Sequence, residues 1–142
     1  MGLKFPALPY FLDGNLRLTD QGAIMKYIAN KYGPELLGKN TRQIGQVEMV
    51  AGVISDLKGN ITMPCYTQGD RVAITMNLIE KVKPLVYYLG EKKFLCGENV
   101  TYVDFCFFEL CDFMDWISQG LLYERHQALL AYHGRVKSLP RL

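Results

Sequence analysis

The stretch from Leu8 to Gly33, LPYFLDGNLRLTDQGAIMKYIANKYG, places the tightest limits on how this chain can fold. Residues 10–12 and 16–18 are of strand-forming types, and the Asp-Gly-Asn sequence at 13–15 separates them. Aspartate, glycine and asparagine tolerate the positive backbone angles that a tight hairpin turn needs. The stretch therefore predicts two short antiparallel strands joined by a turn.

A helix is expected directly after this hairpin. The apolar residues there recur at helical spacing, at Ala23, Ile24, Tyr27 and Ile28. Thr19 and Asp20 stand where a helix N-cap belongs, and Gly33-Pro34 supplies a residue suited to a left-handed stop and one that cannot continue a helix. The first part of the chain thus predicts a β-turn-β-α unit.

A long helix should follow, capped by Asn40 or Thr41. One apolar stripe marks its buried face, through Ile44, Val47, Ala51, Ile54, Leu57 and Ile61. This spacing is typical of an amphipathic helix. We expect the helix to end before Pro64, because proline removes a backbone donor.

Two more helices are expected, one before residue 100 and one near the end of the chain. One should run from Gly69-Asp70 to Gly90, and Pro84 inside it should kink it or cost it a hydrogen bond. The last should cover about 125–137 and stop at Ser138-Leu139-Pro140.

Thr101 and Asp104 give the clearest helix start in the chain. A threonine N-cap with an acidic residue three positions later is a near relative of the capping box, and Val100 is placed to staple it. The segment that follows is so rich in apolar residues that we expect it at the centre of a bundle. A membrane span is excluded by the acidic residues Asp104, Glu109, Asp112 and Asp115.

Composition and charge indicate a globular domain. Of the 142 residues, 49% are hydrophobic and 21% charged, and the net charge of +2 is spread along the chain. A nucleic-acid-binding face or a polybasic membrane patch is therefore not expected. Residues 1–6 lack the pattern of a secretory leader or a myristoylation site, so we expect a cytoplasmic protein.

The cysteines and histidines predict neither a disulfide framework nor a metal site. No C-x-x-C spacing occurs among Cys65, Cys96, Cys106 and Cys111. Cys106 and Cys111 lie in the apolar segment and should behave as small buried hydrophobic residues. His126 and His133, seven apart on one expected helix, are interpreted as ordinary helix-surface residues.

Two motifs resemble the glutathione transferase family. The pattern LPY-x-x-DG-x-x-x-LT running into AI-x-x-YIA-x-K resembles the second half of its glutathione-binding domain, and residues 2–6 resemble the mu class in particular. Gly97-x-x-x-Thr101-x-x-Asp104 resembles the signature of its helical domain. The resemblance covers nearly the whole chain.

The fold class implied by this resemblance is α+β. A partial thioredoxin-like β-β-α unit at 1–34 is expected, then a linker at 35–40 and an all-helical domain at 41–142. A complete member begins with a β-α-β unit that carries the catalytic tyrosine or serine, and it has a further C-terminal segment. This sequence resembles a transferase without either.

The resemblance also implies glutathione-binding residues. Leu8-Pro9 would form a cis-proline turn whose backbone pairs with the cysteinyl part of glutathione. Asp20 and Gln21 stand where the family has Gln-Ser at the helix start, facing the γ-glutamyl carboxylate. The charge of Asp20 would compete with that carboxylate, so capping alone is an equal alternative for Asp20. Ala7 stands where the mu class usually has asparagine.

Two further residues match mu-class positions on the long helix. Asp56 aligns with an aspartate that reaches into the glutathione site of the neighbouring subunit, although an exposed helical aspartate needs no function. Tyr66 aligns with a tyrosine that assists at the electrophile end, and structural packing is the favoured alternative for it. No tyrosine aligns with the donor that activates the thiolate.

Two functions follow as hypotheses. The first is a mu-class-like glutathione S-transferase that, in its full-length form, conjugates reduced glutathione to a hydrophobic electrophile, without a metal. The second is a catalytically inactive structural subunit with the same fold in a larger assembly. A homodimer or a larger protein assembly is expected; if the chain is the mature protein, another polypeptide should cover the strand edge at 9–12 or the exposed face of the sheet.

Overall fold

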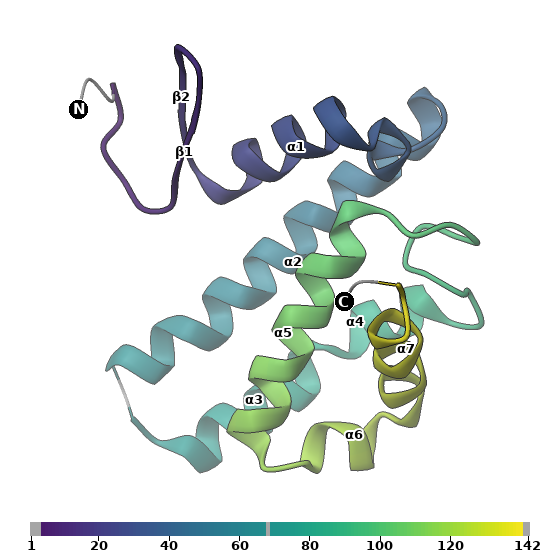
Figure 1. Cartoon of the computed structure of the whole chain (residues 1–142). Helices are drawn as coiled ribbons and strands as arrows, with labels where there is room; N and C mark the ends of the chain where they lie inside the picture. Colours follow the sequence, from purple (N-terminus) through teal and green to yellow (C-terminus); the bar gives the residue numbers. More distant parts are fainter. Residues whose placement is uncertain (1–3, 68, 141–142) are drawn as a thin grey trace.

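The computed structural model describes residues 4–67 and 69–140 as a small hairpin unit followed by a helical bundle (Figure 1). The elements in chain order are β1 (Tyr10–Asp13), β2 (Leu16–Thr19), α1 (Gln21–Tyr32), the 3₁₀ helix η1 (Pro34–Leu37), α2 (Thr41–Thr67), α3 (Arg71–Lys81), α4 (Lys83–Leu89), α5 (Tyr102–Ser118), α6 (Leu121–Arg125) and α7 (Gln127–Lys137). The predicted α+β class is confirmed, with a partial β-β-α unit ahead of a helical domain.

The hairpin is fixed to α1 through its turn. β1 and β2 pair antiparallel, with Tyr10 opposite Thr19. Asp13 accepts a hydrogen bond of 2.7 Å from the hydroxyl of Tyr27 and also pairs with Lys31, both on α1. The ammonium of Lys31, and then the hydroxyl of Tyr27, lower the pKa of Asp13. These polar contacts hold the small sheet where its own two strands would be marginal.

Helix α1 joins the hairpin unit to the helical bundle. Lys26 forms an ion pair of 2.5 Å with Glu48 on α2, and Glu48 also accepts a 3.0 Å hydrogen bond from the hydroxyl of Tyr102 on α5. The sulfur atoms of Met25 and Cys106 lie 3.5 Å apart. One carboxylate therefore links three helices.

Helix α2 continues through Pro64, so the expectation that it ends before this proline is wrong. Proline removes one backbone donor, which leaves the carbonyl of Asn60 without its helical partner. Asn60 is exposed, so water can solvate that carbonyl. The hydroxyl of Thr67 donates to the carbonyl of Met63 at 2.9 Å and supports the last turn. The cost of the proline is thus small enough for the helix to reach Thr67.

The expected helix at 70–90 is divided into two. Helix α3 ends at Lys81 and α4 begins at Lys83, which places Pro84 in the first turn of α4. A proline at this position costs the helix no hydrogen bond, because the first backbone donors of a helix have no partner within it. The predicted disturbance at Pro84 is therefore confirmed, as a break between two helices.

Helix α5 lies at the centre of the bundle, as predicted, and contacts α1, α2, α3, α6 and α7 (Figure 1). Its capping box is present: Asp104 accepts from the backbone of Thr101 at 2.8 Å, and Thr101 caps the N3 backbone. The core that surrounds α5 is drawn from residues between Val47 and Val136. In the described ranges, no helix is long and apolar enough to cross a membrane.

The last predicted helix begins later than expected. Helix α6 ends at Arg125 and α7 begins at Gln127, so His126 lies between them and does not share a helix with His133. The ring of His126 is within hydrogen-bonding distance, 3.2 Å, of the carbonyl of Ile79. The interpretation of these two histidines as neighbours on one helix is wrong.

Candidate functional site

The site predicted from the sequence begins at the turn before β1. The Leu8–Pro9 peptide bond is cis, as the resemblance implies. Pro9 directly precedes Tyr10, and Tyr10 pairs with Thr19 across the sheet. Because Asp20 follows Thr19, the strand register brings the cis-proline turn beside the start of α1. Leu8 is 85% exposed, so this corner of the chain is open to solvent.

Asp20 caps α1. Its side chain accepts a hydrogen bond of 2.9 Å from the backbone of Ala23, and its φ of 79° lies in the left-handed region. A non-glycine residue with positive φ is uncommon and marks a position that the surrounding structure determines. The capping interpretation of Asp20 is confirmed, and its role toward a ligand stays a prediction.

Gln21 is the first residue of α1, and its side chain contacts the long helix. Its Oε1 accepts a hydrogen bond of 3.2 Å from the Nζ of Lys58 on α2. Sequence reasoning missed Lys58, because the contact joins positions 37 residues apart and no local pattern marks it. The structure thus adds one residue to the predicted group at the start of α1.

Asp56 lies on the outer part of α2. It helps to line a shallow depression of about 540 Å³ with Ser55, Gly59, Asn60, Met63 and Pro64. Residues two apart on a helix point in nearly opposite directions, so Asp56 faces away from the side on which Lys58 meets α1. The expected reach of Asp56 into a neighbouring subunit stays a prediction.

Tyr66 near the end of α2 is 88% exposed. The favoured interpretation of this residue as structural packing is therefore wrong for the described residues. A cavity of about 540 Å³ lies at this end of the bundle, lined among others by Cys65, Arg71 and Trp116, and Tyr66 is not part of its wall. The electrophile-site role of Tyr66 stays a prediction.

Cys96, Cys106 and Cys111 are not activated nucleophiles. Cys111 is fully buried, and Cys96 and Cys106 are partly buried. Burial raises the pKa of all three thiols. A nucleophilic cysteine needs the opposite shift. The expected burial is confirmed in full for Cys111 and in part for Cys106. Across residues 4–67 and 69–140, no cluster of three or more metal-ligating side chains occurs.

His133 is not the ordinary surface residue that the sequence predicts. Its ring stacks on Phe108 with centroids 4.3 Å apart, packs against Tyr123, and lies 2.7 Å from a carboxylate oxygen of Asp112. Its side chain is 12% exposed. Aromatic residues of α5 and α6 cover this face of α7, and no local pattern around His133 indicates these distant neighbours.

Beside His133, two polar atoms are buried with no partner among the described residues, Asp115 Oδ1 and the hydroxyl of Tyr123. Burial raises the pKa of both groups. This junction of α5, α6 and α7 is a costly arrangement of polar groups, and it lies outside the predicted glutathione site.

Comparison with known proteins places the chain. A family model described as "Glutathione S-transferase, C-terminal domain" matches residues 56–142. The chain belongs to the glutathione S-transferase family. The match covers α3 to α7 and the later part of α2, so it rests on the helical domain. The hairpin unit is matched instead by the relatives that align over the whole chain.

Several class-mu members of this family are similar to the chain. A class-mu 26 kDa glutathione S-transferase, isozyme 51 of Fasciola hepatica, is 31% identical over 148 residues, which cover 100% of the chain and 65% of the relative. Glutathione S-transferase Mu 1 of Rattus norvegicus is 31% identical over 115 residues, which cover 79% of the chain and 52% of the relative. The matched part of the chain thus spans 65% of the first relative and 52% of the second, less than two thirds of the length of either.

Solved structures show the same fold. The Pi-class glutathione S-transferase of Onchocerca volvulus superposes with a TM-score of 0.87 at 21% identity, over 97% of the chain and 68% of the other chain. The glutathione S-transferase Blo t 8 gives a TM-score of 0.83 at 23% identity, over 99% and 67%. The match includes the hairpin unit as well as the helical domain, because nearly the whole chain is covered.

Proposed function

We propose that the protein containing this chain is a mu-class-like glutathione S-transferase, which conjugates reduced glutathione to a hydrophobic electrophile in the cytoplasm. One observation supports this most directly: the strand register sets the cis Leu8–Pro9 turn beside the start of α1. An open backbone and a helix start then lie at one corner, as recognition of a short γ-glutamyl peptide requires.

Each predicted residue has a chemical part in this proposal. The backbone at Leu8 and Pro9 pairs with the cysteinyl unit of glutathione, as an added strand would. Asp20 and Gln21 meet the γ-glutamyl end, where Gln21 can donate from its amide and Asp20 can accept from the ammonium. Asp56 serves a neighbouring subunit. These contacts bind and orient glutathione without activating its sulfur.

The reaction itself needs a donor to the sulfur. A thiolate attacks the electrophile and the leaving group departs with the electron pair, so a hydroxyl donor that stabilises the thiolate lowers the barrier. The family's donor lies in the β-α-β unit, and no tyrosine of this chain aligns with it. Tyr66 assists at the electrophile end. Recognition of glutathione is thus assigned to this chain, and activation to the donor of the full-length protein.

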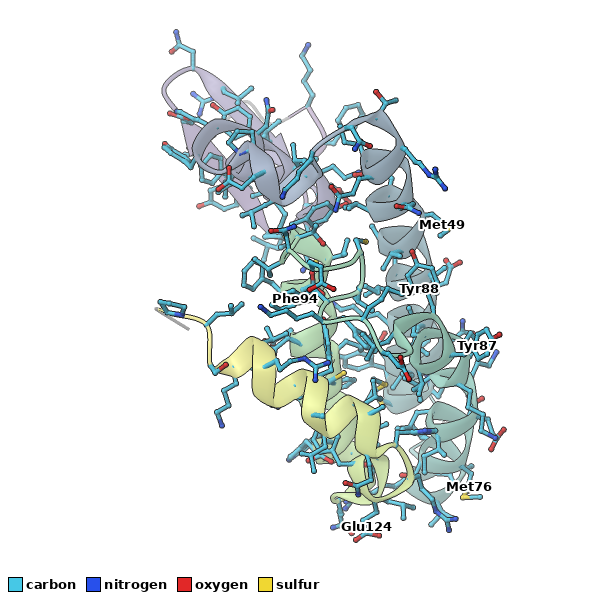
Figure 2. All side chains as sticks on the ribbon, turned by 90° about the vertical axis from the view of Figure 1, so that its right-hand side faces the viewer. Met49, Met76, Tyr87, Tyr88, Phe94 and Glu124 are labelled. Carbon is cyan, nitrogen blue, oxygen red and sulfur yellow. The ribbon has the colours of Figure 1, made fainter. Side chains whose placement is uncertain are left out.

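A second copy of the chain is the proposed partner. Met49 of α2, Met76 of α3 and Tyr87 of α4 are exposed, and they lie along the same edge of the view in Figure 2. A large apolar patch is rarely left open on a monomer. A homodimer would also give Asp56 the neighbouring subunit that its expected role requires.

The alternative is a catalytically inactive structural subunit. Asp20 favours it, because a carboxylate that already caps α1 repels the carboxylate of glutathione. Ala7 favours it as well, since alanine offers no polar side-chain contact where the mu class usually has asparagine.

Calorimetry and a conjugation assay on this chain separate the proposals. We expect the chain to bind glutathione but not to conjugate it to a chloronitrobenzene above the uncatalysed rate, because the thiolate donor is absent. Turnover that disappears in Tyr66→Phe would contradict the assignment of activation to another residue. A folded chain that binds no glutathione would instead favour the structural subunit.

A further inference from the structure

Lys58 differs from the other lysines that join the hairpin unit to its surroundings. Lys26 is paired with the carboxylate of Glu48, and Lys31 with that of Asp13. Lys58, which is exposed on α2, donates to a neutral amide oxygen, that of Gln21. In the part of the chain that the structure describes, no carboxylate lies within ion-pairing distance of Lys58. The ammonium group of Lys58 is therefore not engaged in an ion pair among the described residues.

The contact also fixes which way the amide of Gln21 faces. An ammonium group only donates, so the atom 3.2 Å from Lys58 Nζ must be the amide oxygen. The Nε2 group of Gln21 then points away from Lys58 with both of its donors. A ligand at the start of α1 thus meets amide donors and, beside them, a positive charge.

The positive charge of Lys58 offsets a repulsion in the proposed site. Asp20 caps α1 at 2.9 Å from the backbone of Ala23 and carries a negative charge where the family has a neutral glutamine. A carboxylate that binds there meets like charge, which disfavours it. Lys58 supplies the opposite charge from another helix, and an ammonium–carboxylate hydrogen bond is about twice as strong as a neutral one.

We propose that Lys58 is a binding and positioning residue of the glutathione site: it orients the Gln21 amide and attracts the γ-glutamyl carboxylate that Asp20 repels. This inference rests on the proposed function and adds a residue to it. The ligand class is an anionic γ-glutamyl peptide, and an analogue without the γ-glutamyl carboxylate gains nothing from Lys58.

Calorimetric titration of the chain with two ligands tests the inference. The ligands are glutathione and γ-aminobutyryl-cysteinyl-glycine, which lacks only the γ-glutamyl α-carboxylate and keeps the amine. We expect Lys58→Met to weaken glutathione binding about tenfold or more, as loss of a charge-assisted hydrogen bond does. Binding of the analogue should stay within twofold of wild type, and Lys58→Arg should restore most of the glutathione affinity.

The control is Lys81→Met, which removes an exposed lysine of α3 and should leave the affinity for both ligands unchanged. Thermal melts of each variant check that it folds. Equal glutathione affinity in wild type and Lys58→Met overturns the inference alone. An equal loss for both ligands also overturns it, because Lys58 would then only hold α1 against α2. A wild-type chain that binds neither ligand overturns the proposed function as well.

Discussion

Replacement of Asp104 by alanine should damage the helical bundle more than loss of an ordinary helix cap does. Asp104 is completely buried. Its carboxylate accepts hydrogen bonds from the backbone of Thr101 at 2.8 Å, the hydroxyl of Thr101 at 3.0 Å, the backbone of Leu95 at 2.9 Å and the hydroxyl of Tyr132 at 3.0 Å. One side chain thus ties the start of α5 to the preceding loop and to α7.

The magnitude follows from the donors that alanine leaves behind. From the sequence, the cap alone predicts a cost of about 1 to 2 kcal/mol. The structure adds the backbone donor of Leu95, which is fully buried, and the hydroxyl of Tyr132. A buried donor without a partner costs about 1 to 3 kcal/mol. We therefore expect Asp104→Ala to reduce the free energy of unfolding by about 3 to 5 kcal/mol.

Urea denaturation followed by circular dichroism measures this loss. Asp70→Ala is the matched control, because Asp70 caps α3 through a 3.1 Å bond to the backbone of Ala73 but is exposed. It should cost about 1 kcal/mol. The exposed change Lys39→Ala should cost almost nothing. If Asp104→Ala loses no more stability than Asp70→Ala, the argument from buried donors is wrong, and if it matches Lys39→Ala, the capping argument also fails.

Three further predictions concern other parts of the chain. Asp115→Asn should stabilise the protein at pH 7 but much less near pH 4. Burial raises the pKa of Asp115 above its usual value of about 3.8, so the charged carboxylate that forms as the pH rises above this value destabilises the fold. Equal gains in thermal melts at both pH values would refute this. Pro64→Ala should increase the free energy of unfolding by about 1 kcal/mol or more, since alanine restores a backbone donor inside α2, and an unchanged urea midpoint would count against it. If the chain is the mature protein, a second polypeptide should cover the edge of β1 or the sheet face that exposes Tyr10 and Leu12; hydrogen exchange on the isolated chain that shows an ordered hairpin with edge and face open to solvent would contradict this.

The elements that the sequence predicts well are those with a local cause. The hairpin follows from Asp13-Gly14-Asn15, where Gly14 adopts the positive φ of 57° that the turn needs. The start of α5 follows from Thr101 and Asp104, which are three residues apart and form their bonds within one helical turn. Local backbone chemistry decides these features, so a short stretch of sequence contains the information.

The features that the sequence does not predict depend on distant neighbours. Pro64 stays inside α2 because the carbonyl that it leaves unpaired belongs to an exposed residue. His133 is covered because α5 and α6 place aromatic rings against α7. Lys58 reaches Gln21 only once α1 lies along α2. The family resemblance likewise indicated Asp20 as a site residue, but it did not indicate Lys58, whose positive charge offsets that of Asp20.

The way α1 is attached has a consequence for how the chain opens. The buried core comes from α2 to α7 and the loop before α5, and Met25 and Leu37 are the residues of the preceding segments that pack against it among those described. The hairpin and α1 should therefore form a separate cooperative unit that opens at lower free energy than the bundle. A ligand bound at the cis-proline corner would then raise the free energy of opening of this unit alone. Amide exchange in β1, β2 and α1 would become slower, and exchange in the bundle would stay unchanged.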